Sequence, residues 1–175
     1  MRRKGLICVN TGPGKGKTTA ALGTALRAAG HGLRVLILQF MKGRTDVGEV
    51  KALSRCELPI EIRQFGRRVF FKSRACEAID IHKANQGLEA FKTAMQSRAY
   101  DLIVLDEINM AIDFGLLNAE TVLGLLARKP PDLHVILSGR NAPKELIEMA
   151  DMVTEMTEIK HHYNSGVQAQ KGIEF

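Results

Sequence analysis

One stretch near the N-terminus decides the fold: Thr11-Gly12-Pro13-Gly14-Lys15-Gly16-Lys17-Thr18-Thr19. It follows the apolar run of residues 6–9, which is typical of a buried strand. The Ala/Leu-rich run of residues 18–29 comes next and predicts a helix that ends at Gly30. Glycines between a strand and a helix let backbone N–H groups approach phosphate oxygens, and the helix N-terminus adds positive potential. We therefore predict a phosphate loop over residues 11–19.

The loop departs from the strict pattern G-x-x-x-x-G-K-[ST] at one place, because Thr11 stands where the first glycine belongs. We expect Gly12 and Gly14 to make that turn instead. Lys17 supplies a charge for the phosphates and Thr18 a hydroxyl for Mg²⁺ or Mn²⁺. A glycine-rich turn without a ligand is the alternative, but the strand, the helix and the Lys-Thr pair together favour a nucleotide. The expected nucleotide contacts are Gly12, Pro13, Gly14, Lys15, Gly16, Lys17, Thr18, Thr19 and Arg140.

Three further apolar runs are continuous rather than alternating, at residues 35–38, 102–105 and 135–137. Such strands are typical of a parallel sheet that is covered on both faces. Shorter strands are expected at residues 60–62 and 152–153, a helix at residues 120–127, and loops at residues 41–49 and 66–74. A second helix is indicated by apolar residues spaced three or four apart: Ile81, Ala84, Leu88, Phe91 and Met95. The pattern predicts one α/β domain over residues 1–175, P-loop NTPase-like (RecA-like), with a mostly parallel sheet flanked by helices.

The run of residues 102–105 ends in Asp106-Glu107, as in a Walker B element whose carboxylate orders Mg²⁺. An ordinary acidic helix cap is the alternative for this pair. Glu107 also suits the positioning of a water or hydroxyl nucleophile, which leaves a P-loop ATPase or kinase open. Ser138-Gly139-Arg140 follows the next buried run, so Arg140 could contact a phosphate or a carboxylate, or lie free on the surface.

The composition of the chain restricts its partners and its location less strongly than the motifs do. Twenty-five Lys and Arg against 19 acidic residues give a net charge of +6, which favours an anionic partner without choosing between nucleotide, nucleic acid and polycarboxylate. The sequence has neither a signal peptide pattern nor an apolar run long enough for a membrane span. Its three cysteines form no C-x-x-C pair, so we expect neither disulfides nor a zinc cluster, and a cytoplasmic location.

Two other groups of residues carry possible chemistry. Phe65, Phe70 and Phe71 alternate with five basic residues, Arg63, Arg67, Arg68, Lys72 and Arg74. This patch could hold a flat ligand bearing carboxylates, stack nucleic-acid bases, or be a strand edge with buried rings and solvated arginines. His161 and His162 are adjacent, so we expect their side chains to point apart at the surface, and a metal site there is the less favoured interpretation.

Several motifs together are similar to one family. They are the phosphate loop continued by Ala20-Ala21, Gln39-Phe40-Met41-Lys42-Gly43, Val104-Leu105-Asp106-Glu107, Ser138-Gly139-Arg140, Lys160-His161, and the ending Gly166-Val167-Gln168-Ala169-Gln170-Lys171-Gly172-Ile173-Glu174-Phe175. Along almost the whole chain the sequence resembles the ATP:corrinoid adenosyltransferases of the cobalamin pathway. The phosphate loop alone is unspecific, whereas the second motif and the ending are distinctive.

The resemblance implies that Co(I) of a reduced corrinoid attacks the 5′ carbon of ATP and expels tripolyphosphate. This fits a sequence with no Ser/His/Asp or Cys/His set at motif spacing, because the substrate supplies the nucleophile. By the same resemblance Lys17, Thr18 and Glu107 would be catalytic, and Thr18, Asp106 and Glu107 would hold the metal. Phe70 and Phe71 would press on the corrin face.

The partners are also expectations from the resemblance. Arg67 and Arg68 would pair with carboxylates of an early corrinoid such as cobyrinic acid a,c-diamide, although fully amidated cobalamin stays an alternative substrate. A homodimer and an electron donor such as a flavoprotein are expected, and a nucleic-acid partner is not, because no recognisable nucleic-acid motif is present. Only five residues precede the first strand, so we expect the C-terminal segment or a second subunit to close the site.

Overall fold

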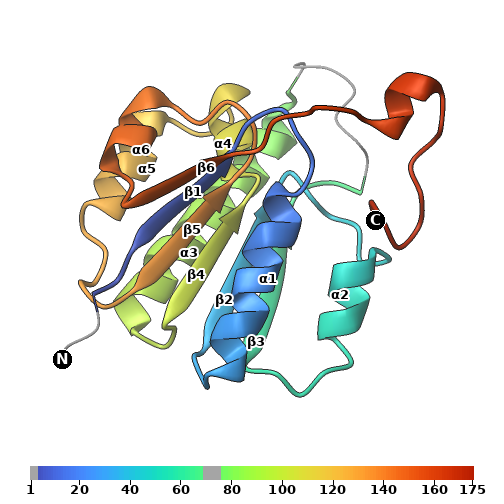
Figure 1. Cartoon of the computed structure of the whole chain (residues 1–175). Helices are drawn as coiled ribbons and strands as arrows, with labels where there is room; N and C mark the ends of the chain where they lie inside the picture. Colours follow the sequence, from blue (N-terminus) through green and yellow to red (C-terminus); the bar gives the residue numbers. More distant parts are fainter. Residues whose placement is uncertain (1–3, 69–75) are drawn as a thin grey trace.

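Six parallel strands form the centre of the protein (Figure 1). The computed structural model describes residues 4–68 and 76–175. Within these, every neighbouring pair of strands is parallel and the order across the sheet is β3-β2-β4-β5-β1-β6. The strands are β1 Ile7–Thr11, β2 Val35–Phe40, β3 Ile60–Phe65, β4 Leu102–Asp106, β5 His134–Ser138 and β6 Met152–Glu155. The predicted α/β fold with a parallel sheet is confirmed.

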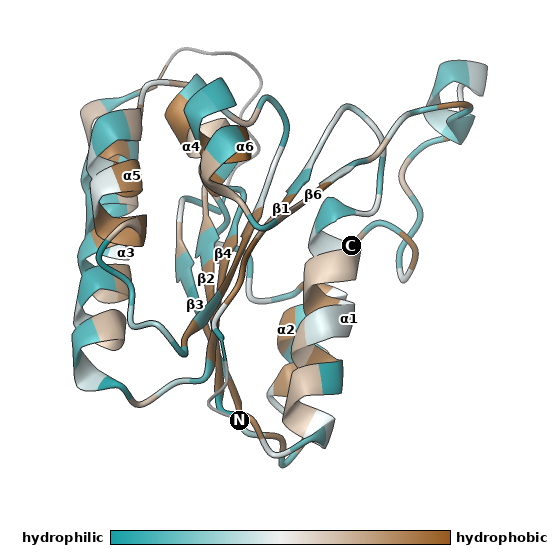
Figure 2. Cartoon of the chain, turned by 60° about the vertical axis from the view of Figure 1, so that its left-hand side comes forward, coloured by the Kyte–Doolittle hydropathy of each residue, from teal (hydrophilic) through white to brown (hydrophobic). Residues whose placement is uncertain are grey.

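Helices cover both faces of the sheet (Figure 2). On one face lie α1 (Lys17–Gly30) and α2 (Gly48–Leu53). The other face carries α3 (Ala78–Ser97), α4 (Ile108–Asp113), α5 (Ala119–Leu126) and α6 (Lys144–Met149). A short 3₁₀ helix, η1 (His162–Ser165), lies in the C-terminal segment. Among the described residues, none of these helices combines the length and the apolar character that crossing a membrane requires.

The sheet separates two apolar cores because side chains alternate along each strand. On β2, Leu36 and Leu38 belong to the larger core beneath α3, and Val35 and Ile37 to the smaller core beneath α1. All residues of β2 and β4 are buried. This burial on both faces explains why their sequences are apolar without interruption.

The same alternation places polar side chains at one end of the sheet. Gln39 follows Val35 and Ile37 at two-residue steps, so it lies on the α1 face. In the strand register Gln39 is paired with Asp106 on β4 and with Gln64 on β3. Ser138 ends β5 on the same face as Ile136. A row of polar groups therefore crosses the carboxyl ends of neighbouring strands, below the start of α1.

Three details differ from the sequence predictions. The strand expected at residues 60–62 continues to Phe65, and α2 begins at Gly48 inside a segment expected to be a loop. Ile81 was expected on the buried stripe of its helix but is 43% exposed. The neighbouring Asp80 takes the inward position because its carboxylate binds Arg67 through two hydrogen bonds of 2.7 and 2.8 Å.

Two helical glycines test how the larger core is packed. A Cβ on Gly87 of α3 would lie 2.7 Å from Cε1 of the fully buried Phe40, whereas a Cβ on Gly23 of α1 would meet nothing within 4 Å. Overpacking costs about 1–3 kcal/mol and Ala in place of Gly in a helix gains up to about 1 kcal/mol. We expect Gly87→Ala to lower the free energy of unfolding by about 1–2 kcal/mol and Gly23→Ala to raise it by up to about 1 kcal/mol, measured by urea denaturation. Equal effects of the two variants would contradict the described packing.

Candidate functional site

The phosphate loop joins β1 to α1, and two of its glycines have left-handed backbone conformations. Gly12 has φ 93° and Gly16 has φ 114°. Gly14 is required for another reason: its Cβ would lie 2.7 Å from the carbonyl oxygen of Met156, to which the Gly14 N–H donates. Thr11 ends β1, and its hydroxyl accepts a hydrogen bond from the Ala142 N–H at 3.2 Å. The turn is thus made by glycines other than the missing first one.

Lys17 is buried under this loop. Its Nζ donates to the carbonyl oxygens of Gly12, at 2.8 Å, and Gly14. Burial lowers the pKa of Lys17, and the nearby Arg140 lowers it further. The ammonium group is therefore held by two carbonyl oxygens of the loop, and phosphate oxygens are stronger acceptors that could replace them.

Asp106 is the most connected side chain of the site and is only 1% exposed. Its Oδ1 accepts hydrogen bonds from the hydroxyls of Ser138, at 2.6 Å, and Thr18, at 2.8 Å. Its Oδ2 accepts from Gln39 Nε2 at 3.1 Å and from Lys42 Nζ at 2.8 Å. Burial acts to raise the pKa of Asp106, but the charge of Lys42 and these hydrogen bonds outweigh it and hold the pKa below the ordinary value. The carboxylate is thus kept ionised.

Glu107 caps α4 in a strained conformation, with φ 62°. Its backbone N–H donates to Ser138 Oγ at 3.1 Å. Burial raises the pKa of the Glu107 carboxyl, and the neighbouring Asp106 raises it further. The charges of Lys42 and Lys17 oppose this rise.

The remaining predicted nucleotide contacts lie around the same loop. Arg140 donates from Nε and Nη2 to the carbonyl oxygen of Pro13, at 3.2 and 3.1 Å. Lys15 is exposed, and its Nζ donates to the carbonyl oxygen of Ile173 at 2.7 Å. Thr19 is exposed in the first turn of α1. The fold therefore brings the predicted phosphate contacts and Asp106-Glu107 to one place.

The oxygen atoms gathered here suit Mg²⁺, which prefers hydroxyl, carboxylate and phosphate oxygens. The Thr18 hydroxyl and the Asp106 carboxylate are already 2.8 Å apart, and the Glu107 carboxyl adjoins them along the chain. Burial and hydrogen bonds keep the Asp106 carboxylate in a fixed orientation. The residues present fit a magnesium ion bound together with phosphates.

The C-terminal tail (residues 156–175) crosses the phosphate loop (Figure 1). Its start packs on Gly14 through Met156, and its end is held by Lys15 through Ile173. The ring of Phe175, the last residue, lies 5.7 Å below the guanidinium carbon of Arg44, next to α2. The tail of the same chain thus covers one side of the loop.

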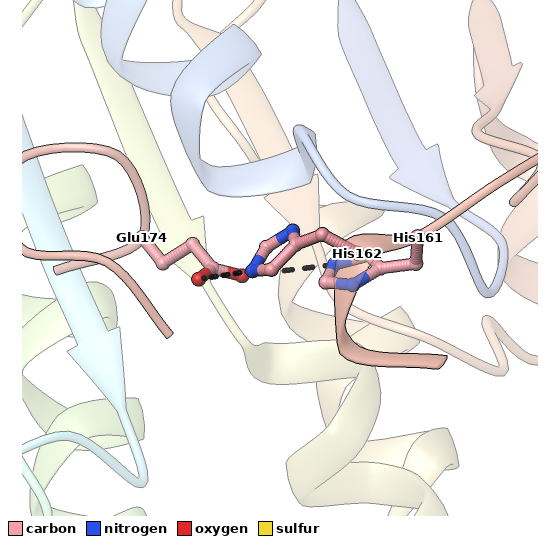
Figure 3. A group of neighbouring side chains, drawn as sticks. All are labelled: His161, His162 and Glu174. Carbon is pink, nitrogen blue, oxygen red and sulfur yellow. Dashed lines mark hydrogen bonds and ion pairs between the residues drawn. The ribbon is translucent and has the colours of Figure 1, made fainter. Parts of the chain in front are cut away.

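His161 and His162 hold the tail together, and the prediction that they point apart is wrong (Figure 3). Their rings are stacked with centroids 4.6 Å apart, and their Nε2 atoms lie 3.6 and 3.1 Å from the Glu174 carboxylate. His161 is the extended N-cap of η1 and His162 its first residue, so the alternation of a regular strand or helix does not apply. The three donor groups lie within 4.8 Å of one another, but the imidazole planes are nearly parallel, at 24°, rather than converging on one ion.

The predicted corrinoid contacts are only partly within the described residues. Phe70 and Phe71 lie outside them. Arg67 binds two carboxylates of its own chain, Asp80 through two hydrogen bonds and Glu77 through one of 2.7 Å. Arg68 is exposed, and its Nη2 donates to the Thr45 hydroxyl at 3.2 Å. Arg67 therefore binds the first turn of α3, and Arg68 lies at the surface.

Sequence reasoning assigned no role to Gln39, Lys42 or Ser138, although all three contact Asp106. A signal was present, because Gln39 and Ser138 are polar residues near the ends of otherwise apolar runs. In a parallel sheet such residues meet at the edge where ligands bind. Lys42 lies two residues beyond β2, and its signal was its place in the distinctive motif of residues 39–43, to which no role was assigned.

Comparison with known proteins gives consistent matches. The family described as ATP:corrinoid adenosyltransferase BtuR/CobO/CobP matches residues 3–175. A corrinoid adenosyltransferase of Sinorhizobium sp. is 39% identical over 98% of this chain and 81% of its own length. Corrinoid adenosyltransferases of Pseudomonas aeruginosa and Escherichia coli K12 are 36% and 34% identical, each over 98% of this chain and over 84% and 86% of their own lengths.

Ser138→Ala tests the network around Asp106. The change removes a hydroxyl that donates to Asp106 and accepts from the Glu107 N–H, which leaves two buried groups each short of a partner. We expect the free energy of unfolding to fall by about 2 kcal/mol, because an unsatisfied buried polar group costs about 1–3 kcal/mol. Urea denaturation measures this change. The exposed Ser54→Ala is the control, and an equally small effect of both variants would contradict the network.

Glu174→Gln tests the fastening of the tail. The Gln170 N–H lowers the pKa of Glu174, and His162, Lys15 and His161 lower it further. A lowered pKa means that this anchoring is complete above the ordinary pKa of a glutamate and is lost as the pH falls through the lowered value. We expect weaker protection of the amide hydrogens of residues 161–175 against exchange, relative to the intrinsic rate at each pH, in the variant at neutral pH and in the wild type only at acidic pH. Glu120→Gln, on α5, is the control and should leave exchange in the tail unchanged.

Proposed function

Because the chain belongs to the ATP:corrinoid adenosyltransferase family, we propose that it transfers the 5′-deoxyadenosyl group of ATP to the Co(I) centre of a corrinoid. In this reaction both electrons of the new Co–C bond come from Co(I), which becomes formally Co(III). The C5′–O bond of ATP breaks, and its electron pair leaves with tripolyphosphate. No oxidant, reductant or protein nucleophile takes part in the transfer itself.

One observation carries the proposal: the Thr18 hydroxyl and the buried Asp106 carboxylate meet at the mouth of a phosphate loop that also holds Lys17. This arrangement is suited to a triphosphate with its metal ion. Since the leaving group of the transfer is itself a triphosphate, stabilising its charge directly lowers the barrier.

Different residues of the site bind the phosphates and the metal ion. Lys17 and the N–H groups of the loop bind phosphate oxygens, and Arg140 adds a second cation beside Pro13. When Mg²⁺ is bound by Thr18, Asp106 and Glu107, it neutralises part of the charge on the phosphates. The protein's task is then to hold C5′ in line with the incoming cobalt.

The corrinoid is expected beside the segment that follows β3. Arg68 is an exposed cation in the described part of that segment. Phe70 and Phe71, which lie outside the described residues, would supply apolar surface for the corrin face. Arg67 is already bound to Asp80 and Glu77, so its role in this proposal is to order the segment rather than to bind a substrate carboxylate. A homodimer and an external electron donor that delivers Co(I) complete the proposal.

Hydrolysis or phosphoryl transfer directed by Glu107 is the alternative activity, and it predicts a different product. The comparisons give it no support, because the curated relatives named above are adenosyltransferases. An ATPase or kinase would release ADP, whereas attack at C5′ releases tripolyphosphate.

The test uses Mg-ATP with a chemically reduced corrinoid, and phosphorus NMR to identify the products. We expect tripolyphosphate only when Co(I) corrinoid is present. Lys17→Ala should lower the rate by about 10²–10³, the usual effect of removing one preorganised donor from a developing charge. Lys92→Ala, on the exposed side of α3, is the matched control and should retain the wild-type rate. Release of ADP and phosphate without corrinoid would contradict the proposed function.

A further inference from the structure

Lys42 lies where a cation bound to the site would be expected. Its Nζ is 2.8 Å from Asp106 Oδ2 and 3.1 Å from Thr18 Oγ1, the two groups that suit Mg²⁺. The Lys42 side chain is 31% exposed, and the Asp106 side chain only 1%. In this arrangement an ammonium group of the chain itself neutralises the buried carboxylate.

The backbone conformation around Lys42 directs its side chain toward Asp106. Met41 has φ 58°, a left-handed conformation that costs free energy in any residue other than glycine. A Cβ on Gly66 would lie 2.3 Å from the backbone nitrogen of Lys42, and a Cβ on Gly43 would lie 2.4 Å from the Gly66 carbonyl oxygen. The segment after β2 thus lies directly on the segment after β3, and only glycines permit the contact.

The ammonium group and a metal ion compete for the same oxygens. Mg²⁺ binds its ligands at about 2.0–2.1 Å, so an ion on Thr18 Oγ1 and Asp106 would be far too close to Nζ as it now lies. Two cations at that separation repel each other strongly. The side chain of lysine is flexible and carries three donors, so Nζ can turn to a new acceptor without movement of the backbone.

A triphosphate in the loop supplies that acceptor. Thr18 is the second residue of α1 and belongs to the phosphate loop of residues 11–19, so phosphates bound by Lys17 and the loop would lie near Lys42. Nζ of Lys42 is an ammonium group that already donates to Asp106 Oδ2 at 2.8 Å and to Thr18 Oγ1 at 3.1 Å. A charged donor beside an anionic leaving group forms a strong hydrogen bond.

We propose that Lys42 closes the metal site until a triphosphate arrives, and then moves from Asp106 to the triphosphate. This rests on the proposed function, because it requires phosphates in the loop of residues 11–19. Two consequences follow. The protein binds a free divalent ion poorly without nucleotide, and Lys42 joins Lys17 and Arg140 as a third cation on the tripolyphosphate leaving group.

The first test measures binding of Mn²⁺, as a probe for Mg²⁺, to the protein without nucleotide by electron paramagnetic resonance. Lys42→Met removes the charge and keeps the length of the side chain. We expect it to bind Mn²⁺ at least about tenfold more tightly than the wild type, since the competing cation is gone. Lys42→Arg keeps the charge and should bind Mn²⁺ as poorly as the wild type. Equal Mn²⁺ affinity of wild type and Lys42→Met would overturn the closing role.

The second test measures binding of tripolyphosphate in the presence of Mg²⁺ by calorimetry. Lys42→Met should bind roughly 10–100-fold more weakly, because one charge-assisted contact is lost. Lys92→Met on α3 is the control. Wild-type affinity in Lys42→Met would overturn the second role of Lys42. A wild-type protein that binds neither Mg-ATP nor tripolyphosphate would instead overturn the proposed function, and the role of Lys42 on the leaving group with it.

Folding is checked by thermal denaturation of each variant. Lys42→Gln serves as a second uncharged variant, because its amide can still donate to Asp106 and so protects the fold. It should also bind Mn²⁺ more tightly than the wild type and tripolyphosphate more weakly. If Lys42→Met is unstable, these two affinities of Lys42→Gln decide the proposal by the same criteria.

Discussion

The charge of Asp106, buried at the carboxyl end of β4, is the constraint on which the site depends. A buried carboxylate is costly unless donors surround it, and removing a single partner leaves an expensive defect. Asp106 obtains its donors from α1, from β2 and the segment after it, and from β5. Its hydrogen bonds therefore fix the phosphate loop, the sheet edge and the Lys42 segment relative to one another. The group that suits the metal also orders its surroundings.

The phosphate loop depends in the same way on the end of the chain. Gly12 and Gly14 lie so close to Met156 that a Cβ at either position would collide with its backbone, and the tail returns to the loop again at Lys15. These glycines thus serve the packing of the protein on itself, in addition to the phosphate contacts proposed for them. The contacts of His161 and His162 with the Glu174 carboxylate join the two ends of the tail segment 161–174.

Much of this could be predicted from the sequence, because it follows from local patterns. Continuous apolar runs indicate a doubly covered parallel sheet, and the loop of residues 11–19 with Asp106-Glu107 indicates a nucleotide site. Contacts that depend on how distant segments meet could not be predicted. The direction of Lys42 follows from the left-handed conformation of Met41. The inward position of Asp80 follows from its contact with Arg67, 13 positions earlier in the chain, and the stacking of His161 on His162 follows from the fold of the tail. None of these has a periodic signal in the sequence.

We infer that Asp106 and the phosphate loop hold a metal-bound triphosphate as a leaving group. A crystal structure of the protein with Mg²⁺ and tripolyphosphate should then show phosphates along residues 11–19, the ion between Thr18 and Asp106, and Lys42 Nζ on a phosphate oxygen rather than on Asp106. Phosphates bound elsewhere, or an ion bound away from Asp106 with the Lys42 contact intact, would contradict it.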